Sequence, residues 1–175
     1  LHFGGGTPTY LSDGQMDELM QHLHRWFRFA PDAEGEYSIE VDPRTVSRER
    51  IATLRRQGFN RISLGVQDFE PDVQHAVNRI QPEAETLDII EAARQAGFRS
   101  ISIDLIYGLP KQTLETIART LDKVIEAAPN RIAVYNYAHL PHLFKPQRRI
   151  ADHDLPAGDT KLAMLALCIQ RLTDA

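Results

Sequence analysis

The chain has 175 residues, of which 42% are apolar and 25% are charged, a composition typical of one globular domain with its own core. Its formal net charge of -4 argues against nucleic acid or an anionic membrane surface as the main partner and favours a small-molecule ligand. The sequence contains no apolar stretch of about 18 residues and no signal-peptide pattern. We therefore expect no membrane partner and a cytoplasmic location.

The chain contains one cysteine, Cys168, which excludes disulfides within the chain and a metal site built from cysteines alone. It lies among apolar residues on a predicted helix, where a buried and inert thiol is typical. At the other end, residues 1–3 run directly into Gly4 and read as the tail of a strand. We therefore expect the chain to be a piece of a longer domain.

Short β-like runs alternate with longer helical segments along the chain. This order predicts repeated βα units and a parallel sheet. The predicted strands are residues 1–3, 37–41, 61–66, 100–106 and 131–137.

The helical segments carry their own boundary residues. A capping-box pattern begins the first at Ser12, and Ser47 can cap the second, which Gly58 ends. The apolar face of the first helix is formed by Met16, Leu19, Met20, Leu23 and Phe27. The later helices are predicted at residues 83–96, 114–125 and about 160–172.

The predicted strands have one apolar face and one polar face. In the strand at 37–41 three apolar residues alternate with Ser38 and Glu40, and the strands at 61–66 and 100–106 repeat this pattern. A parallel sheet covered by helices on both faces usually has continuous apolar runs instead. We therefore predict an α/β fold whose parallel strands form a partial (β/α) barrel, because a complete barrel needs about 250 residues.

Three polar residues and a glycine-rich turn mark a candidate ligand site. Glu40, Gln67 and Asp104 lie on the polar face at or near the carboxyl ends of three strands, where such barrels place ligand-binding groups. Carboxylates there accept hydrogen bonds from ribose hydroxyls or an amine, which favours a nucleoside-like ligand. Singly, each residue is also typical of a solvated strand end. The turn at 4–8 lets a ligand approach the backbone, although an ordinary turn has the same pattern.

Four longer motifs resemble a known family. They are GGGTPT at 4–9, SIEVDP at 38–43, GFNRISLGVQDF at 58–69 and IDLIYGLPKQT at 103–113. In this order and spacing they resemble the radical S-adenosylmethionine (SAM) family of oxygen-independent coproporphyrinogen III oxidases and haem chaperones. The resemblance covers essentially the whole chain. The motifs EVDP at 40–43, VNR at 77–79 and NYAHLP at 136–141 are more similar to the oxidase branch.

The resemblance implies which residues bind SAM. Gly5, Gly6 and Thr7 would hold its methionine end through backbone groups, and Glu40 would bind it through the ribose. The positions that match contacts to SAM, or to a second SAM molecule, are Gln67, Arg79, Asp104 and Ala138. Without the resemblance, Arg79 would be read as an ordinary surface arginine after the third strand.

The resemblance also implies a [4Fe-4S] cluster. In the family a CxxxCxxC loop before the glycine motif holds the cluster, and that loop is absent from this chain. Residues 1–175 would then be the central part of a radical SAM core domain, truncated at both ends. The full-length enzyme would decarboxylate coproporphyrinogen III oxidatively to protoporphyrinogen IX in haem biosynthesis, with reduced flavodoxin or ferredoxin as electron donor. We expect the chain alone, with no metal site or catalytic residue of its own, to be inactive.

Two alternatives stay open. A haem chaperone would share the fold without decarboxylating a substrate. A cluster-free aldolase-like barrel would need a lysine nucleophile or an acid and base pair on the polar strand face, and neither is evident. His139 and His142 follow the fifth strand and are placed to face the site, but no carboxylate stands at ligand spacing to complete a metal site with them. The basic stretch at 145–149 would suit a tetracarboxylate substrate, although solvated loop charges are the more typical interpretation of it.

Overall fold

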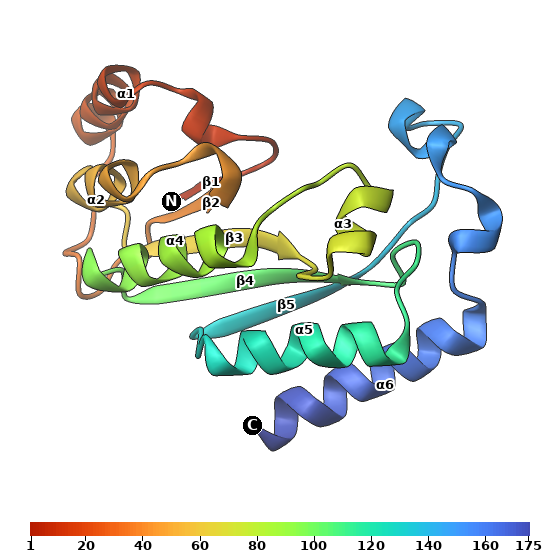
Figure 1. Cartoon of the computed structure of the whole chain (residues 1–175). Coiled ribbons are helices and arrows are strands. Elements are labelled where there is room, and N and C mark those ends of the chain that lie inside the picture. The colour runs from red at the N-terminus through yellow and green to blue at the C-terminus, as the bar shows by residue number, and fades with distance from the viewer. The chain divides into compact units, whose positions relative to one another are not determined.

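A computed structural model describes all residues from 1 to 175 as parallel strands alternating with helices (Figure 1). The strands form one five-stranded sheet in the order β1-β2-β3-β4-β5, so every strand pairs with its neighbour in sequence. The five predicted strands are confirmed to within a residue or two. They are β1 (His2–Phe3), β2 (Ser38–Val41), β3 (Arg61–Gln67), β4 (Ser100–Tyr107) and β5 (Arg131–Asn136).

The helices begin and end close to the predicted residues. The α-helices are α1 (Asp13–Trp26), α2 (Arg48–Arg56), α3 (Pro71–Ala76), α4 (Glu83–Gln95), α5 (Leu114–Glu126) and α6 (Gly158–Asp174). Four short 3-10 helices complete the chain: η1 (Pro8–Tyr10), η2 (Pro43–Thr45), η3 (Lys145–Arg149) and η4 (Asp152–Asp154). None of the helices combines the length and apolar composition that a transmembrane segment requires.

Local capping explains where the predicted helices start. The Ser12 hydroxyl accepts a hydrogen bond from the Gln15 amide, and the Gln15 side chain accepts one from the Ser12 amide, which completes the capping box. Ser47 likewise caps α2 by accepting a hydrogen bond from the Arg50 amide. The assignment of Phe27 to the apolar face of the first helix is wrong: Phe27 follows the last residue of α1 in an extended conformation and is 63% exposed.

The chain divides into two compact units. The first consists of Leu1–Gly65 and Ala84–Ile103, and the second of Val66–Glu83 and Asp104–Ala175. The division runs through β3 and β4, so the carboxyl-terminal parts of both strands belong to the second unit.

The first unit confirms the predicted strand faces. On β2 and β3 every second residue is buried, and Ile39, Leu64 and Ile103 are fully enclosed. β1, β2 and β3 pair in parallel, with Ile39 opposite Ile62 and Glu40 opposite Ser63. The polar residues that alternate with this core are partly exposed, which leaves Glu40 available on the other face.

In the second unit α5 packs against α6 (Figure 1). Buried residues of α5 such as Leu121 and buried residues of α6, Met164 and Cys168, make up its core, and an ion pair joins Arg171 to Asp122 between the two helices. α3 also belongs to this unit. It was not predicted as a helix, because its six residues are too few to display helical periodicity.

Candidate functional site

The glycine-rich turn of the first unit is held against β2 by one hydrogen bond. The Gly5 amide donates to a carboxylate oxygen of Glu40 at 3.0 Å, so two of the residues predicted to bind SAM are in direct contact. Gly5 and Gly6 have φ values of +80° and +144°, which only glycine adopts without strain. A Cβ atom added to either would meet nothing within 4 Å, so the outer side of the turn is open.

The backbone of this turn offers hydrogen-bond donors. The amides of Gly6 and Thr7 donate to no acceptor within the chain, and both residues are exposed. Thr7 is the N-cap residue before η1, and its side chain makes no capping hydrogen bond. Beside these donors, Glu40 supplies a half-buried carboxylate. Such a set, with amides for a carboxylate and a carboxylate for hydroxyls or an ammonium group, fits the amino-acid and ribose parts of SAM.

Two residues of this site were missed by sequence reasoning. His2 Nδ1 lies 2.7 Å from Ser38 Oγ, and its Nε2 lies 3.5 Å from Glu40 Oε1, so the imidazole packs beside the Glu40 carboxylate. Gly4 lies so close to both that an added Cβ would come within 2.5 Å of His2 Nε2 and 2.7 Å of Glu40 Oε1. The run of three glycines was a visible signal, but no feature of the sequence separates Gly4 from its neighbours.

The second unit contains Gln67, at the end of β3. Its φ of +67° is in the left-handed region, where a residue with a side chain is uncommon. The side-chain oxygen Oε1 is buried and accepts no hydrogen bond within the chain. Because a buried polar atom normally has a partner, this oxygen is an acceptor in need of a donor. Strain and an unpaired acceptor at the same residue are typical of a ligand contact.

A buried carboxyl group next to Gln67 fixes the strand end. Asp68 Oδ1 accepts hydrogen bonds from the Glu70 amide at 2.7 Å and the Thr120 hydroxyl at 3.0 Å, and Oδ2 accepts one from Gln112 Nε2. Burial raises the pKa of Asp68, and the three hydrogen bonds oppose that rise. The side-chain oxygen of Gln112 accepts from the Gly108 and Leu109 amides, so the network joins the ends of β3 and β4.

A second buried amide holds the segment that carries Arg79. Gln74 Nε2 donates to the carbonyl oxygens of Asp68 and Gln81, each at 2.9 Å, and Gln74 Oε1 accepts from the Gln81 amide. The Arg79 amide donates to the Gln74 carbonyl at 2.8 Å. Gln74 therefore ties the positions of Gln67 and Arg79 to one network within this unit.

The two remaining predicted residues also belong to the second unit. Asp104 lies on β4 between the buried Ile103 and Leu105 and is itself partly exposed, as the alternating pattern predicted. Ala138 is exposed after β5, and its carbonyl accepts a hydrogen bond from Gln147 Nε2 at 3.0 Å. Gln147 also accepts from the Leu140 amide, so it holds the loop at both ends.

The residues of this chain do not supply ligands for an iron–sulfur cluster. Cys168 is 1% exposed on α6, and no group of three or more histidine, cysteine, aspartate or glutamate side chains is placed to hold a metal ion. Burial raises the pKa of the Cys168 thiol, which further lowers its reactivity because the thiolate is the reactive form.

We expect Cys168 of the folded chain to react with Ellman's reagent at least about 100-fold more slowly than after unfolding in urea, because the reagent must wait for a local opening of α6. Absorbance at 412 nm follows the reaction directly. Rapid labelling of the folded chain would contradict the burial of this thiol.

Comparison with known proteins identifies the class to which this fold and site belong. The Radical SAM superfamily model matches residues 1–124, and the chain therefore belongs to the radical SAM superfamily. This membership sets aside the alternative of an unrelated aldolase-like barrel. The oxygen-independent coproporphyrinogen III oxidase of Pseudomonas aeruginosa is 54% identical over 175 residues, which are 100% of this chain and 38% of that protein.

Solved structures agree with this assignment. The structure of the coproporphyrinogen III oxidase HemN from Escherichia coli, described as a radical SAM enzyme, matches with a TM-score of 0.94 and 51% identity over 99% of this chain and 40% of that one. A structure of Elp3 from Methanocaldococcus infernus matches with a TM-score of 0.74 at 14% identity, covering 96% of this chain and 44% of that one, a likeness of fold alone. The predicted partial (β/α) barrel of the radical SAM type is thereby confirmed.

Proposed function

We propose that residues 1–175 are the SAM-binding central part of the core domain of an oxygen-independent coproporphyrinogen III oxidase. The observation that carries this proposal is the contact between Gly5 and Glu40 beside an open glycine turn with free amides. The named relatives support the choice of substrate, since the Pseudomonas aeruginosa and Escherichia coli proteins, 54% and 51% identical, both carry the name of that oxidase.

The residues of the first unit have separate tasks in this proposal. The amides of Gly6 and Thr7 donate to the carboxylate of the methionine end, and the turn at Gly5 lets that end approach the backbone. Glu40 accepts from the ribose hydroxyls with Oε1, the carboxylate oxygen that does not accept from the Gly5 amide. When bound, SAM supplies radical chemistry, while the protein binds, orients and shields it.

The residues of the second unit also contact SAM, or a second SAM molecule, in this proposal. Gln67 offers the unpaired acceptor Oε1. Arg79 offers a guanidinium group for a carboxylate, Asp104 a carboxylate, and Ala138 an exposed backbone position. In the full-length enzyme, coproporphyrinogen III is the substrate, a reduced flavodoxin or ferredoxin supplies electrons, and the compartment is the cytoplasm.

Glu40→Gln tests the site most directly. Gln keeps an oxygen that can accept from the Gly5 amide, so the turn is retained while the charge and one acceptor are lost. We expect the dissociation constant for SAM, measured by isothermal titration calorimetry, to rise about 10- to 100-fold, the range for a hydrogen bond to a charged group.

Glu18→Gln is the matched control, because the Glu18 side chain is 74% exposed on α1. We expect it to bind SAM as the unchanged chain does. Failure of the unchanged chain to bind SAM would overturn the proposed function. Equal affinity in Glu40→Gln would overturn the role of Glu40 alone.

A further inference from the structure

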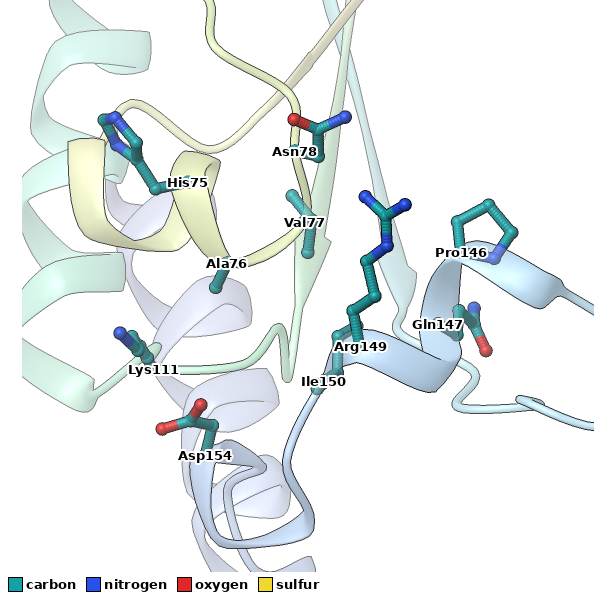
Figure 2. Close-up of a pocket in the computed structure, with 10 residues that line it drawn as sticks. All are labelled: His75, Ala76, Val77, Asn78, Lys111, Pro146, Gln147, Arg149, Ile150 and Asp154. Carbon is teal, nitrogen blue, oxygen red and sulfur yellow. The ribbon is translucent and has the colours of Figure 1, made fainter.

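A recess lies within the second unit, and its lining includes none of the residues that are proposed to bind SAM. It is a cavity of about 400 Å³ formed by three separate segments of the chain. They are the end of α3 with the residues after it, the loop between β4 and α5, and residues 146–154 (Figure 2). The lining residues that matter for its chemistry are His75, Lys111, Arg149 and Asp154.

Two cations of this cavity have no carboxylate partner. Lys111 and Arg149 form no ion pair, whereas Lys123 of the same unit lies 2.6 Å from Glu83, and Arg119 lies 2.8 Å from Glu70. Figure 2 shows the Arg149 side chain extending from η3, with its guanidinium group on the side of the recess where Asn78 and Pro146 lie. Unpaired cations in a recess attract an anion, and a guanidinium group binds a carboxylate through two parallel hydrogen bonds.

The lining is held in place by the backbone. Lys111 has a φ of +63°, and its amide donates to the Asp154 carbonyl at 2.7 Å, which joins the β4–α5 loop to η4. Asn78 has a φ of +53°, and its amide donates to the His75 carbonyl at 3.1 Å. A recess whose walls are already ordered loses little conformational entropy when a ligand binds.

The rest of the lining indicates what surrounds the anion. Ala76, Val77, Pro146 and Ile150 give the recess apolar walls between the cations. The volume of about 400 Å³ lies near the lower end of the range of about 300–1,000 Å³ for small-molecule sites, so the recess suits one edge of a tetrapyrrole better than the whole ring. A carboxylate on a short chain attached to an apolar ring satisfies both the charge and the walls.

We propose that this cavity binds one propionate-bearing edge of the tetrapyrrole substrate, with Arg149 as the main contact of the carboxylate and Lys111 as a second. The inference rests on the proposed function, because it takes its substrate class from there. Asp154 is the one acid in the lining, and its carboxylate repels the ligand. The sign of its effect therefore distinguishes an anion site from a site for a cation.

The test is a fluorescence titration of the chain with coproporphyrin III, the stable oxidised form of the tetracarboxylate. We expect Arg149→Gln and Lys111→Gln each to weaken binding about 3- to 10-fold, because both side chains are exposed and partly screened. Asp154→Asn should tighten binding about 2- to 5-fold. The tetramethyl ester of the same porphyrin, which has no carboxylates, should bind equally weakly to all variants.

Arg148→Gln is the matched control, because Arg148 is the exposed neighbour of Arg149 on η3 and does not line the cavity. Thermal unfolding of each variant separates loss of binding from loss of fold, and SAM titration of the same samples tests the proposed function separately. Equal porphyrin affinity in Arg149→Gln, weaker binding in Asp154→Asn, or binding that esterification leaves unchanged would each overturn the inference. Those results with SAM binding intact would leave the proposed function standing.

Discussion

Asp68→Asn is expected to lower the free energy of unfolding by about 2 kcal/mol, the cost of a buried hydrogen-bonding group left without its partner. Asn keeps one oxygen to accept from the Glu70 amide and the Thr120 hydroxyl, but its NH₂ group then faces Gln112 Nε2, which is also a donor. Gln112 cannot relieve this conflict by turning over, because its oxygen already accepts from the Gly108 and Leu109 amides. Urea unfolding followed by circular dichroism measures the change.

The reciprocal replacement shows whether the direction of this bond is the cause. Gln112→Glu places a second carboxylate against Asp68 and should destabilise the chain most at neutral pH, with relief on acidification as the pair takes up a proton. In the double variant, the NH₂ group of the introduced asparagine can donate to the introduced carboxylate. Stability should then return in part, because the Ile106 carbonyl still lacks the donor that Gln112 Nε2 supplied at 3.1 Å. Additive losses would contradict the account.

The pH dependence of the unchanged chain follows from the same carboxyl group. Burial raises the pKa of Asp68 above the ordinary value of 3.8, so the folded chain holds this proton more tightly than the unfolded chain. Protonation of Asp68 therefore adds stability that is fully present below pH 3.8 and is lost as the pH rises through the raised pKa.

Gly4→Ala should lower the affinity for SAM at least about tenfold, measured by calorimetry. The new methyl group would come within 2.7 Å of Glu40 Oε1 and within 2.5 Å of His2 Nε2, so the carboxylate must move away from the Gly5 amide. Both neighbours are side chains, so the expected effect is a displaced site rather than an unfolded chain.

Gly14→Ala is the control for this substitution. A Cβ at Gly14, in the first turn of α1, would meet nothing within 4 Å, so SAM binding should be unchanged and stability equal or slightly higher. Unchanged SAM affinity in Gly4→Ala would show that Glu40 can move without loss to the site.

The alternating strand faces and the capped helix starts were predictable because they follow from local repeats. Side chains alternate along β2 and β3 whatever surrounds them, and Ser12 caps α1 through atoms only three residues away. The same reasoning placed Glu40 and Asp104 on the open face. Their position on the strands predicted that they contact a ligand. The resemblance to a known family then predicted that this ligand is SAM.

The parts that could not be predicted depend on contacts between distant residues. The bond from Gln112 to Asp68 spans 44 residues, and no local pattern marks either residue as its partner. The crowding at Gly4 depends on where Glu40 of the neighbouring strand places its carboxylate. The left-handed conformation of Gln67 was hidden for the same reason, since glycine or asparagine is the usual signal for it.

At position 67, the residue that best suits the backbone conformation is not the residue that best suits ligand binding. Glycine would fit the φ of +67° without strain, but it would remove the buried acceptor Oε1. Selection of variants for thermal stability alone would therefore favour glycine at this position, whereas selection for ligand binding would favour glutamine. Replacing Gln67 with glycine is thus expected to raise the stability of the chain and to lower its affinity for the ligand.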